Sequence, residues 1–369
     1  MSAAKYLSAR RSFYFMFIGL LVFALYLYFF VGFGQIVQVA KGVNAEQYAF
    51  FYALAICSIV IGNFLWAASW RSALRTLSVK ISMKNAFLYY WTGYFVDLVV
   101  PCETICGEVT RLYLVRKETN ENFGAIAAGG ITNRIVAYII VVAGLYSSAL
   151  LLFLKSSIPA LILSFLILII VGASAYLAVL LYLAFSDKAA SKITSLIMRL
   201  RCFFRPKKYK SKDLSPETQE NLAAFYQGFK TFREHPRHLV KPFIFMTLSF
   251  LLNLVAYILV FFALGIQSQP FAFFIIIYFI AGSITDAAAS FSVGTLEILL
   301  STIFIFYGLN PALSGITAVL VRSVTFWFPL ILGYIIVQIV GAKKLLAPNP
   351  QKAPLNKPTS EPVISTPTN

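Results

Sequence analysis

Long runs without a single charged residue limit what this chain can fold into. Three such runs cover residues 48–70, 156–186 and 242–285. Each is long enough to match a helix of about 20 residues, which spans the hydrocarbon core of a bilayer. Lipid cannot satisfy backbone polar groups, and the runs lack the short alternation of barrel strands. The sequence therefore predicts an all-α integral membrane protein.

The full transmembrane helices are predicted to number six, at residues 12–31, 48–70, 123–154, 158–185, 242–266 and 311–342. The first follows Lys5, Arg10 and Arg11, as a signal peptide would, but it is long and no small-residue cleavage site follows. We therefore expect it to be retained. Two further hydrophobic segments, 86–115 and 271–308, contain charges and helix breakers. Each is either a re-entrant hairpin or a pair of short spans.

The basic residues predict the orientation. Three Lys or Arg residues precede the first span and thirteen lie between residues 188 and 241, whereas the connections on the other side hold only Lys41 and Lys155. Because Lys and Arg accumulate on the cytoplasmic side, we expect a multi-pass protein of the cell membrane with both termini and loop 187–241 in the cytoplasm. The net charge of +17 then reflects topology and does not indicate a nucleic-acid partner.

Residues 1–344 are predicted to form one polytopic membrane domain. Within loop 187–241, residues 188–205 fit either a basic amphipathic helix on an anionic leaflet or a solvated linker. A second helix is predicted to begin at Ser215-Pro216 and to pack its apolar face under the membrane domain through Leu222, Phe225, Tyr226, Phe229 and Phe232. Residues 345–369 carry six prolines among polar residues, so we expect a disordered cytoplasmic tail.

The two irregular segments share a layout. Glu108 precedes Arg134 by 26 residues, and Glu297 precedes Arg322 by 25. Each arginine begins an uncharged stretch of 20 residues. Since the predicted topology brings the first segment in from the cytoplasm and the second from outside, the two form an inverted repeat of broken helices, which in transporters builds a site near the bilayer midplane. Coincidental spacing is the alternative.

Charges inside these segments identify candidate binding residues, because a charge in the bilayer pairs or faces a cavity. A guanidinium fork suits a lipid phosphate, and nearby carboxylates orient the arginines or bind an amino group. The candidates for a lipid headgroup are Arg111, Arg134, Arg322, Glu108, Glu297, Asp97 and Asp286.

Local spacing adds detail to these candidates. Glu108 and Arg111 stand three residues apart, close enough for an ion pair on one helix face, which alternatively only holds the hairpin together. Asp97 and Asp286 are expected to cap helix starts. The alternative for Arg134 and Arg322 is snorkelling toward the membrane surface. The hairpin turns are expected at Pro101, Gly107 and Gly294.

The chain offers no sign of a metal site, a cofactor or a catalytic centre. Its four cysteines form no CxxC pair, and it has only two histidines.

A set of short motifs resembles the lysylphosphatidylglycerol synthase transmembrane family over residues 10–344. The motifs are Trp70-Arg71-x-x-Leu74, Gly93, Asp97, Pro101, Gly107-Glu108, Arg111, Arg134, Gly294-x-x-Glu297 and Arg322. The resemblance implies a flippase-like domain with two oppositely inserted re-entrant hairpins, often fused to a cytoplasmic aminoacyl transferase. We expect neither that enzyme nor a glycosyltransferase in this chain.

Two departures from the family pattern concern the hairpins. The family commonly has a proline-glycine turn before its second glycine, where this chain has Ser290-Phe291-Ser292-Val293-Gly294. Asp97 stands where the family frequently has asparagine.

The leading hypothesis is a lipid flippase-like transporter that moves a polar-headed lipid, anionic or aminoacylated, between leaflets. No ATP-binding motif is present, so movement would be downhill or ion-coupled. One alternative is a membrane glycosyl- or acyl-transferase with Glu108 or Glu297 as general base, but no DxD-type donor site accompanies them. Another is a membrane anchor that binds a separate soluble lipid-modifying enzyme through loop 187–241.

Overall fold

In the part of the chain that the structure describes, the protein is a helical bundle, and five of its helices are long and apolar enough to cross a membrane. The computed structural model describes residues 42, 44–100, 105–154, 160–185, 216–288 and 293–346, and its regular structure in these ranges is entirely helical. The candidate spans are Ala45–Thr76, Phe123–Phe153, Leu166–Phe185, Pro236–Ala263 and Pro311–Gly341. The predicted all-α membrane fold is confirmed. The expected span 12–31 lies outside the described residues.

These spans belong to α3 (Ala45–Thr76), α6 (Phe123–Phe153), α7 (Ala160–Phe185), α10 (Val240–Ala263) after the 3-10 turn η2 (Pro236–Leu239), and a composite last helix. They expose large apolar side chains such as Phe50, Leu168 and Ile331, each more than half accessible. A soluble protein would bury such a surface, whereas lipid is a suitable solvent for it. The outer surface of the bundle is therefore built for the bilayer.

The last helix changes its winding part-way. It consists of α13 (Pro311–Arg322), a π-helical turn η4 (Ser323–Trp327) and α14 (Phe328–Leu346). The hydroxyl groups of Tyr52 and Ser323 lie 2.6 Å apart, which ties this turn to α3. The wide turn follows Arg322 directly, and π-helical turns are frequent at functional positions.

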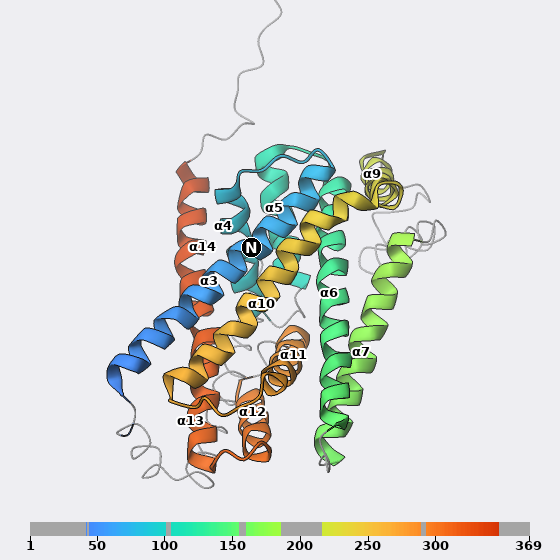
Figure 1. Cartoon of the computed structure of the whole chain (residues 1–369). Coiled ribbons are helices and arrows are strands. Elements are labelled where there is room, and N and C mark those ends of the chain that lie inside the picture. Colours follow the sequence, from blue (N-terminus) through green and yellow to red (C-terminus); the bar gives the residue numbers. More distant parts are fainter. Residues whose placement is uncertain are drawn as a thin grey trace, which may run out of the picture.

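Both irregular segments form pairs of short helices. The first contains α4 (Met83–Val99) and α5 (Ile105–Thr119), and the second contains α11 (Phe271–Ala288) and α12 (Thr295–Phe306). In Figure 1, α4 and α5 lie in the half of the molecule that also holds α9 (Pro216–Glu234), whereas α12 lies in the opposite half beside the start of α13. The helix breaks were expected. The relation of the two pairs as an inverted repeat stays a prediction.

A close contact between α3 and α10 forms the scaffold beside these pairs. The hydroxyl of Ser249 donates a hydrogen bond to the carbonyl of Gly62 at 2.7 Å. A Cβ atom on Gly62 would lie 2.6 Å from Nδ2 of Asn253. Small residues allow membrane helices to approach closely, and here they bring the amide side chains of Asn63 and Asn253 toward the centre of the bundle.

The helix α9 (Pro216–Glu234) packs against α6 near one end of the bundle (Figure 1). It begins at the proline where the sequence predicted a helix start. Phe229 and Phe232, from its predicted apolar face, are buried. A Cβ atom on Gly228 would lie 2.6 Å from Cβ of Ala128 on α6, so the glycine lets the two helices approach closely at this point. Residues 188–205 and 347–369 lie outside the described residues.

The predicted orientation is testable with single cysteines in a background where Cys57, Cys102, Cys106 and Cys202 are replaced by serine. We expect a membrane-impermeant maleimide to label Ser268→Cys, between α10 and α11, in intact cells. It should label His235→Cys, before η2, only after the membrane is opened. Both positions are solvent-exposed, so accessibility alone does not separate them. The reverse labelling pattern would contradict the topology inferred from basic residues.

Candidate functional site

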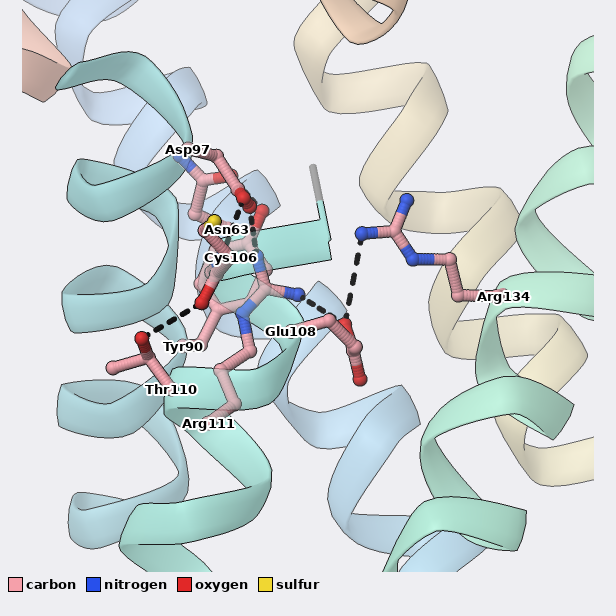
Figure 2. A network of polar contacts seen from close by, with 9 residues as sticks. Asn63, Tyr90, Asp97, Cys106, Glu108, Thr110, Arg111 and Arg134 are labelled. Carbon is pink, nitrogen blue, oxygen red and sulfur yellow. Dashed lines mark hydrogen bonds and ion pairs between the residues drawn. The ribbon is translucent and has the colours of Figure 1, made fainter. Parts of the chain in front are cut away.

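Four charged side chains from α4, α5 and α6 form one network. Nη1 of Arg111 donates to Oε2 of Glu108 at 2.9 Å, and Nη2 of Arg111 donates to Oδ2 of Asp97 at 3.0 Å. Nη2 of Arg134 lies 3.7 Å from the same Oε2 of Glu108 (Figure 2). The expected ion pair between Glu108 and Arg111 is present. The network holds two acids and two arginines, so its formal charges balance.

Asp97 links the network to a helix start. Its Oδ1 atom accepts the backbone N–H of Gly107 at 2.8 Å, in the first turn of α5. The first N–H groups of a helix have no intrahelical partner and carry the positive end of the helix dipole, so they favour a carboxylate. Asp97 thus caps a helix that begins eight residues later in the chain. This is the capping role that the sequence suggested.

Two glycines let α4 and α5 approach closely enough for these contacts. A Cβ atom on Gly93 would collide with the side chain of Arg111, and one on Gly107 would collide with the carboxylate of Asp97. Gly107 was expected at a hairpin turn, but it lies inside the first turn of α5, facing α4. Its role in the structure is close helix packing. Pro101, the other expected turn residue in this pair, lies outside the described residues.

Neighbouring aromatic and small residues complete the surroundings. Cζ of Arg111 lies 5.0 Å from the centre of the Tyr90 ring, within the range of a cation–π contact. The hydroxyl of Tyr90 donates to Oδ1 of Asn63 on α3 at 3.1 Å. On the other side, a Cβ atom on Gly130 of α6 would lie 2.7 Å from Oε1 of Glu108. The absence of a side chain there makes room for the glutamate.

A second ion pair joins α12 to the end of α13. Nε of Arg322 donates to Oε1 of Glu297 at 3.0 Å, and both side chains are almost fully buried, at 2% and 5% exposure. Oε2 of Glu297 accepts the backbone N–H of Gly294 at 2.7 Å, and Arg322 lies over the Phe326 ring at 4.4 Å. Arg322 therefore does not snorkel. Gly294, with φ of +84°, supplies the left-handed backbone just before α12.

The two halves of the bundle thus repeat one pairing. In each, the glutamate in the first turn of a short helix pairs with the arginine that follows it by 26 or 25 residues in the next long helix. Leu98, near the end of α4, and Val293, just before α12, lie in one apolar cluster with Phe326. This cluster brings the ends of the two broken pairs together inside the bundle.

A cavity of about 160 Å³ lies against the first network. Asp97, Arg111 and Arg134 line it, and the rest of its wall is rich in aromatic, amide and hydroxyl side chains, among them Trp66, Tyr90, Tyr94, Asn63, Asn253, Ser283 and Thr325. Glu108, Glu297 and Arg322 are not part of this wall, and the side chain of Asp286 lies outside the described residues. The structure therefore separates the candidates into a network facing the cavity and a buried pair that does not line it.

Sequence reasoning missed the uncharged polar wall. Asn63 and Asn253 each interrupt an otherwise apolar run, and this was the available signal. The hydroxyl of Ser283 is buried without a hydrogen-bond partner in the structure and lines the cavity. Among the described residues, no group of three or more His, Cys, Asp or Glu side chains is placed to hold a metal ion.

Comparison with known proteins extends this picture. The family model of the lysylphosphatidylglycerol synthase transmembrane region matches residues 16–333, which includes both charged networks and the cavity. The chain belongs to this family.

Two relatives within the same size range are archaeal. The UPF0104 membrane protein PH1989 of Pyrococcus horikoshii is 25% identical over 299 residues, covering 78% of this chain and 86% of the relative. The UPF0104 membrane protein MJ1595 of Methanocaldococcus jannaschii is 22% identical over 329 residues, covering 86% of this chain and 92% of the relative. No solved structure matches the chain significantly.

The buried pair is expected to be structural, which a matched comparison tests. Arg322→Ala leaves the carboxylate of Glu297 buried without its partner, so it should destabilise the protein by about 3 kcal/mol or more. The control is Lys230→Ala, which removes the exposed Lys230–Glu234 pair of α9 and should cost less than about 1 kcal/mol. Unfolding of the purified variants in detergent measures both. Equal stability of the two variants would contradict the assignment.

Proposed function

We propose that this chain is a lipid flippase-like transporter that moves a polar-headed lipid, anionic or aminoacylated, between the leaflets of the cell membrane. The observation that carries the proposal is the cavity, which places Asp97, Arg111 and Arg134 inside a bundle whose outer surface is apolar. A cavity with charged side chains in its wall, among lipid-facing helices, is an arrangement that a headgroup needs and that a purely structural bundle does not.

The two kinds of charge suit two parts of a headgroup. Arg111 and Arg134 present guanidinium groups, which bind phosphate oxygens with charge-assisted hydrogen bonds. Asp97, on the cavity wall, supplies a carboxylate for an amino group. The family description refers to lysylphosphatidylglycerol synthase, whose product carries both groups. This agreement between the family and the residues supports an aminoacylated or anionic glycerophospholipid as the substrate class.

The size of the cavity supports transport of the headgroup alone. A volume of about 160 Å³ is below the range of roughly 300–1,000 Å³ that is usual for whole drug-sized ligands. A phosphate with a small substituent fits this space, whereas acyl chains do not. The chains would remain in lipid, beside exposed apolar residues of the outer helices. The fixed charges and amides of the cavity would replace water around the headgroup and so lower the cost of moving it across.

Reconstitution in liposomes tests the proposal. We expect wild-type protein to accelerate leaflet exchange of fluorescent phosphatidylglycerol or lysylphosphatidylglycerol, measured by quenching with an impermeant reductant. Arg134→Ala should slow exchange by roughly tenfold or more, because it removes a charged phosphate contact. Arg237→Ala is the matched control, since Arg237 is exposed on η2 away from the cavity. Exchange no faster than in protein-free vesicles would overturn the proposal.

A further inference from the structure

In the charged network, the carboxylate of Glu108 lies between two arginines, at a position where another anion would bind. Nη1 of Arg111 and Nη2 of Arg134 both approach the same oxygen, Oε2 of Glu108, at 2.9 Å and 3.7 Å. We propose that Glu108 is an internal competitor for a phosphate group, which displaces it from Arg134 and Arg111 when the headgroup enters the cavity. This inference rests on the proposed function and specifies how its site is occupied.

Carboxylate and phosphate oxygens compete for the same donors. Both are anionic acceptors that bind guanidinium N–H groups in similar geometry. Arg111 and Arg134 line the cavity, whereas Glu108 is not part of its wall. A phosphate in the cavity would therefore approach the two arginines from one side while Glu108 holds them from the other. Binding of the headgroup becomes an exchange of the anion that the two arginines hold.

The network is built so that Glu108 can leave without disorganising the rest. Arg111 keeps its second carboxylate contact, with Asp97 at 3.0 Å, and Asp97 is fixed by the N–H of Gly107 at 2.8 Å. The contact of Glu108 with Arg134 is long, at 3.7 Å, and weaker than a direct hydrogen bond. On its other side, Glu108 faces Gly130, which offers no side chain to hold it.

Glu297, the glutamate of the buried ion pair, is held by more direct contacts than Glu108. Glu297 has one oxygen 3.0 Å from Nε of Arg322 and the other 2.7 Å from the N–H of Gly294. Its side chain is 5% exposed, against 14% for Glu108. Glu297 is also absent from the cavity wall. The two glutamates therefore lie at similar sequence distances from their arginines, 26 and 25 residues, but differ in how tightly they are held.

Once displaced from the arginines, the carboxylate of Glu108 is available to an ammonium group. When phosphate binds Arg111 and Arg134, Glu108 is left beside Asp97 as an acceptor for an ammonium group on the same headgroup. A lipid with both phosphate and amine could satisfy all four charged side chains at once. A lipid with phosphate alone would leave one carboxylate without a cationic partner.

Binding of soluble probes to the purified protein in detergent tests the competition. The probes are dihexanoyl phosphatidylglycerol, inorganic phosphate and dihexanoylglycerol, which lacks phosphate. We expect Glu108→Gln to bind dihexanoyl phosphatidylglycerol about tenfold more tightly than wild type, because a neutral amide no longer competes for the arginines. Binding of dihexanoylglycerol should not change. A gain for inorganic phosphate as well would assign the effect to the phosphate group, and a gain for the lipid alone to the intact headgroup.

A second variant keeps the test valid if Glu108→Gln does not fold. Glu108→Asp keeps the charge but shortens the side chain by one methylene, which draws the carboxylate back from both arginines, so it should also raise the affinity for phosphatidylglycerol. Its matched control is Glu234→Asp, which shortens an exposed carboxylate of α9 and should leave the affinity unchanged.

The outcomes separate this inference from the function on which it rests. If wild type binds phosphatidylglycerol, Arg134→Ala weakens that binding, and folded Glu108→Gln binds no more tightly than wild type, Glu108 is not a competitor and the inference is wrong. A similar gain for dihexanoylglycerol would also overturn it, because that probe has no phosphate. If neither wild type nor any variant binds phosphatidylglycerol, the proposed headgroup site itself is wrong.

Discussion

The helix breaks and buried charges of this bundle depend on one constraint. A polar group in the hydrocarbon core of a membrane has no solvent partner, and leaving it unpaired costs free energy. The hydrocarbon core cannot hydrogen-bond to a carboxylate, a guanidinium or the first amides of a helix. The broken helices create such amides inside the bundle, and Asp97 and Glu297 each accept one of them, at Gly107 and Gly294. The same two acids then pair with Arg111 and Arg322. Helix interruption and buried charge therefore compensate each other.

The buried ion pair and the charged network meet this constraint in different ways, because one is enclosed and the other faces a cavity. Glu297 and Arg322 are sealed among apolar side chains and contribute to holding α12 against α13. The network of Asp97, Glu108, Arg111 and Arg134 faces a cavity through three of its four members. A sealed pair suits the joining of helices, whereas a network with an open side retains the capacity to exchange partners. The functional proposals depend on this asymmetry, which the shared sequence spacing did not reveal.

Local patterns predicted the five spans that the structure describes, the helix breaks and the pair of Glu108 and Arg111, because these depend on composition or on residues one helical turn apart. The start of α9 at Pro216 was predictable for the same reason. The cavity wall was not, since Asn63, Tyr90 and Arg111 meet only after three helices pack together. Gly107 was assigned to a turn because glycine is common there, but its contact with α4 depends on tertiary packing. Long-range contacts of this kind leave only a faint trace in a single sequence.

The π-helical turn at Ser323–Trp327 has a consequence for how the last helix serves the two halves of the bundle. One extra residue in a helix rotates everything after it by about 100°. With this offset, α13 packs on α12 while α14 packs on α4, where Gly333 lies close to Phe95. The π-helical turn therefore lets α13 and α14 each direct its packing face toward a different half of the bundle. Loss of a single residue from this turn would leave hydropathy and length almost unchanged, yet it would rotate the packing stripe of α14 away from α4.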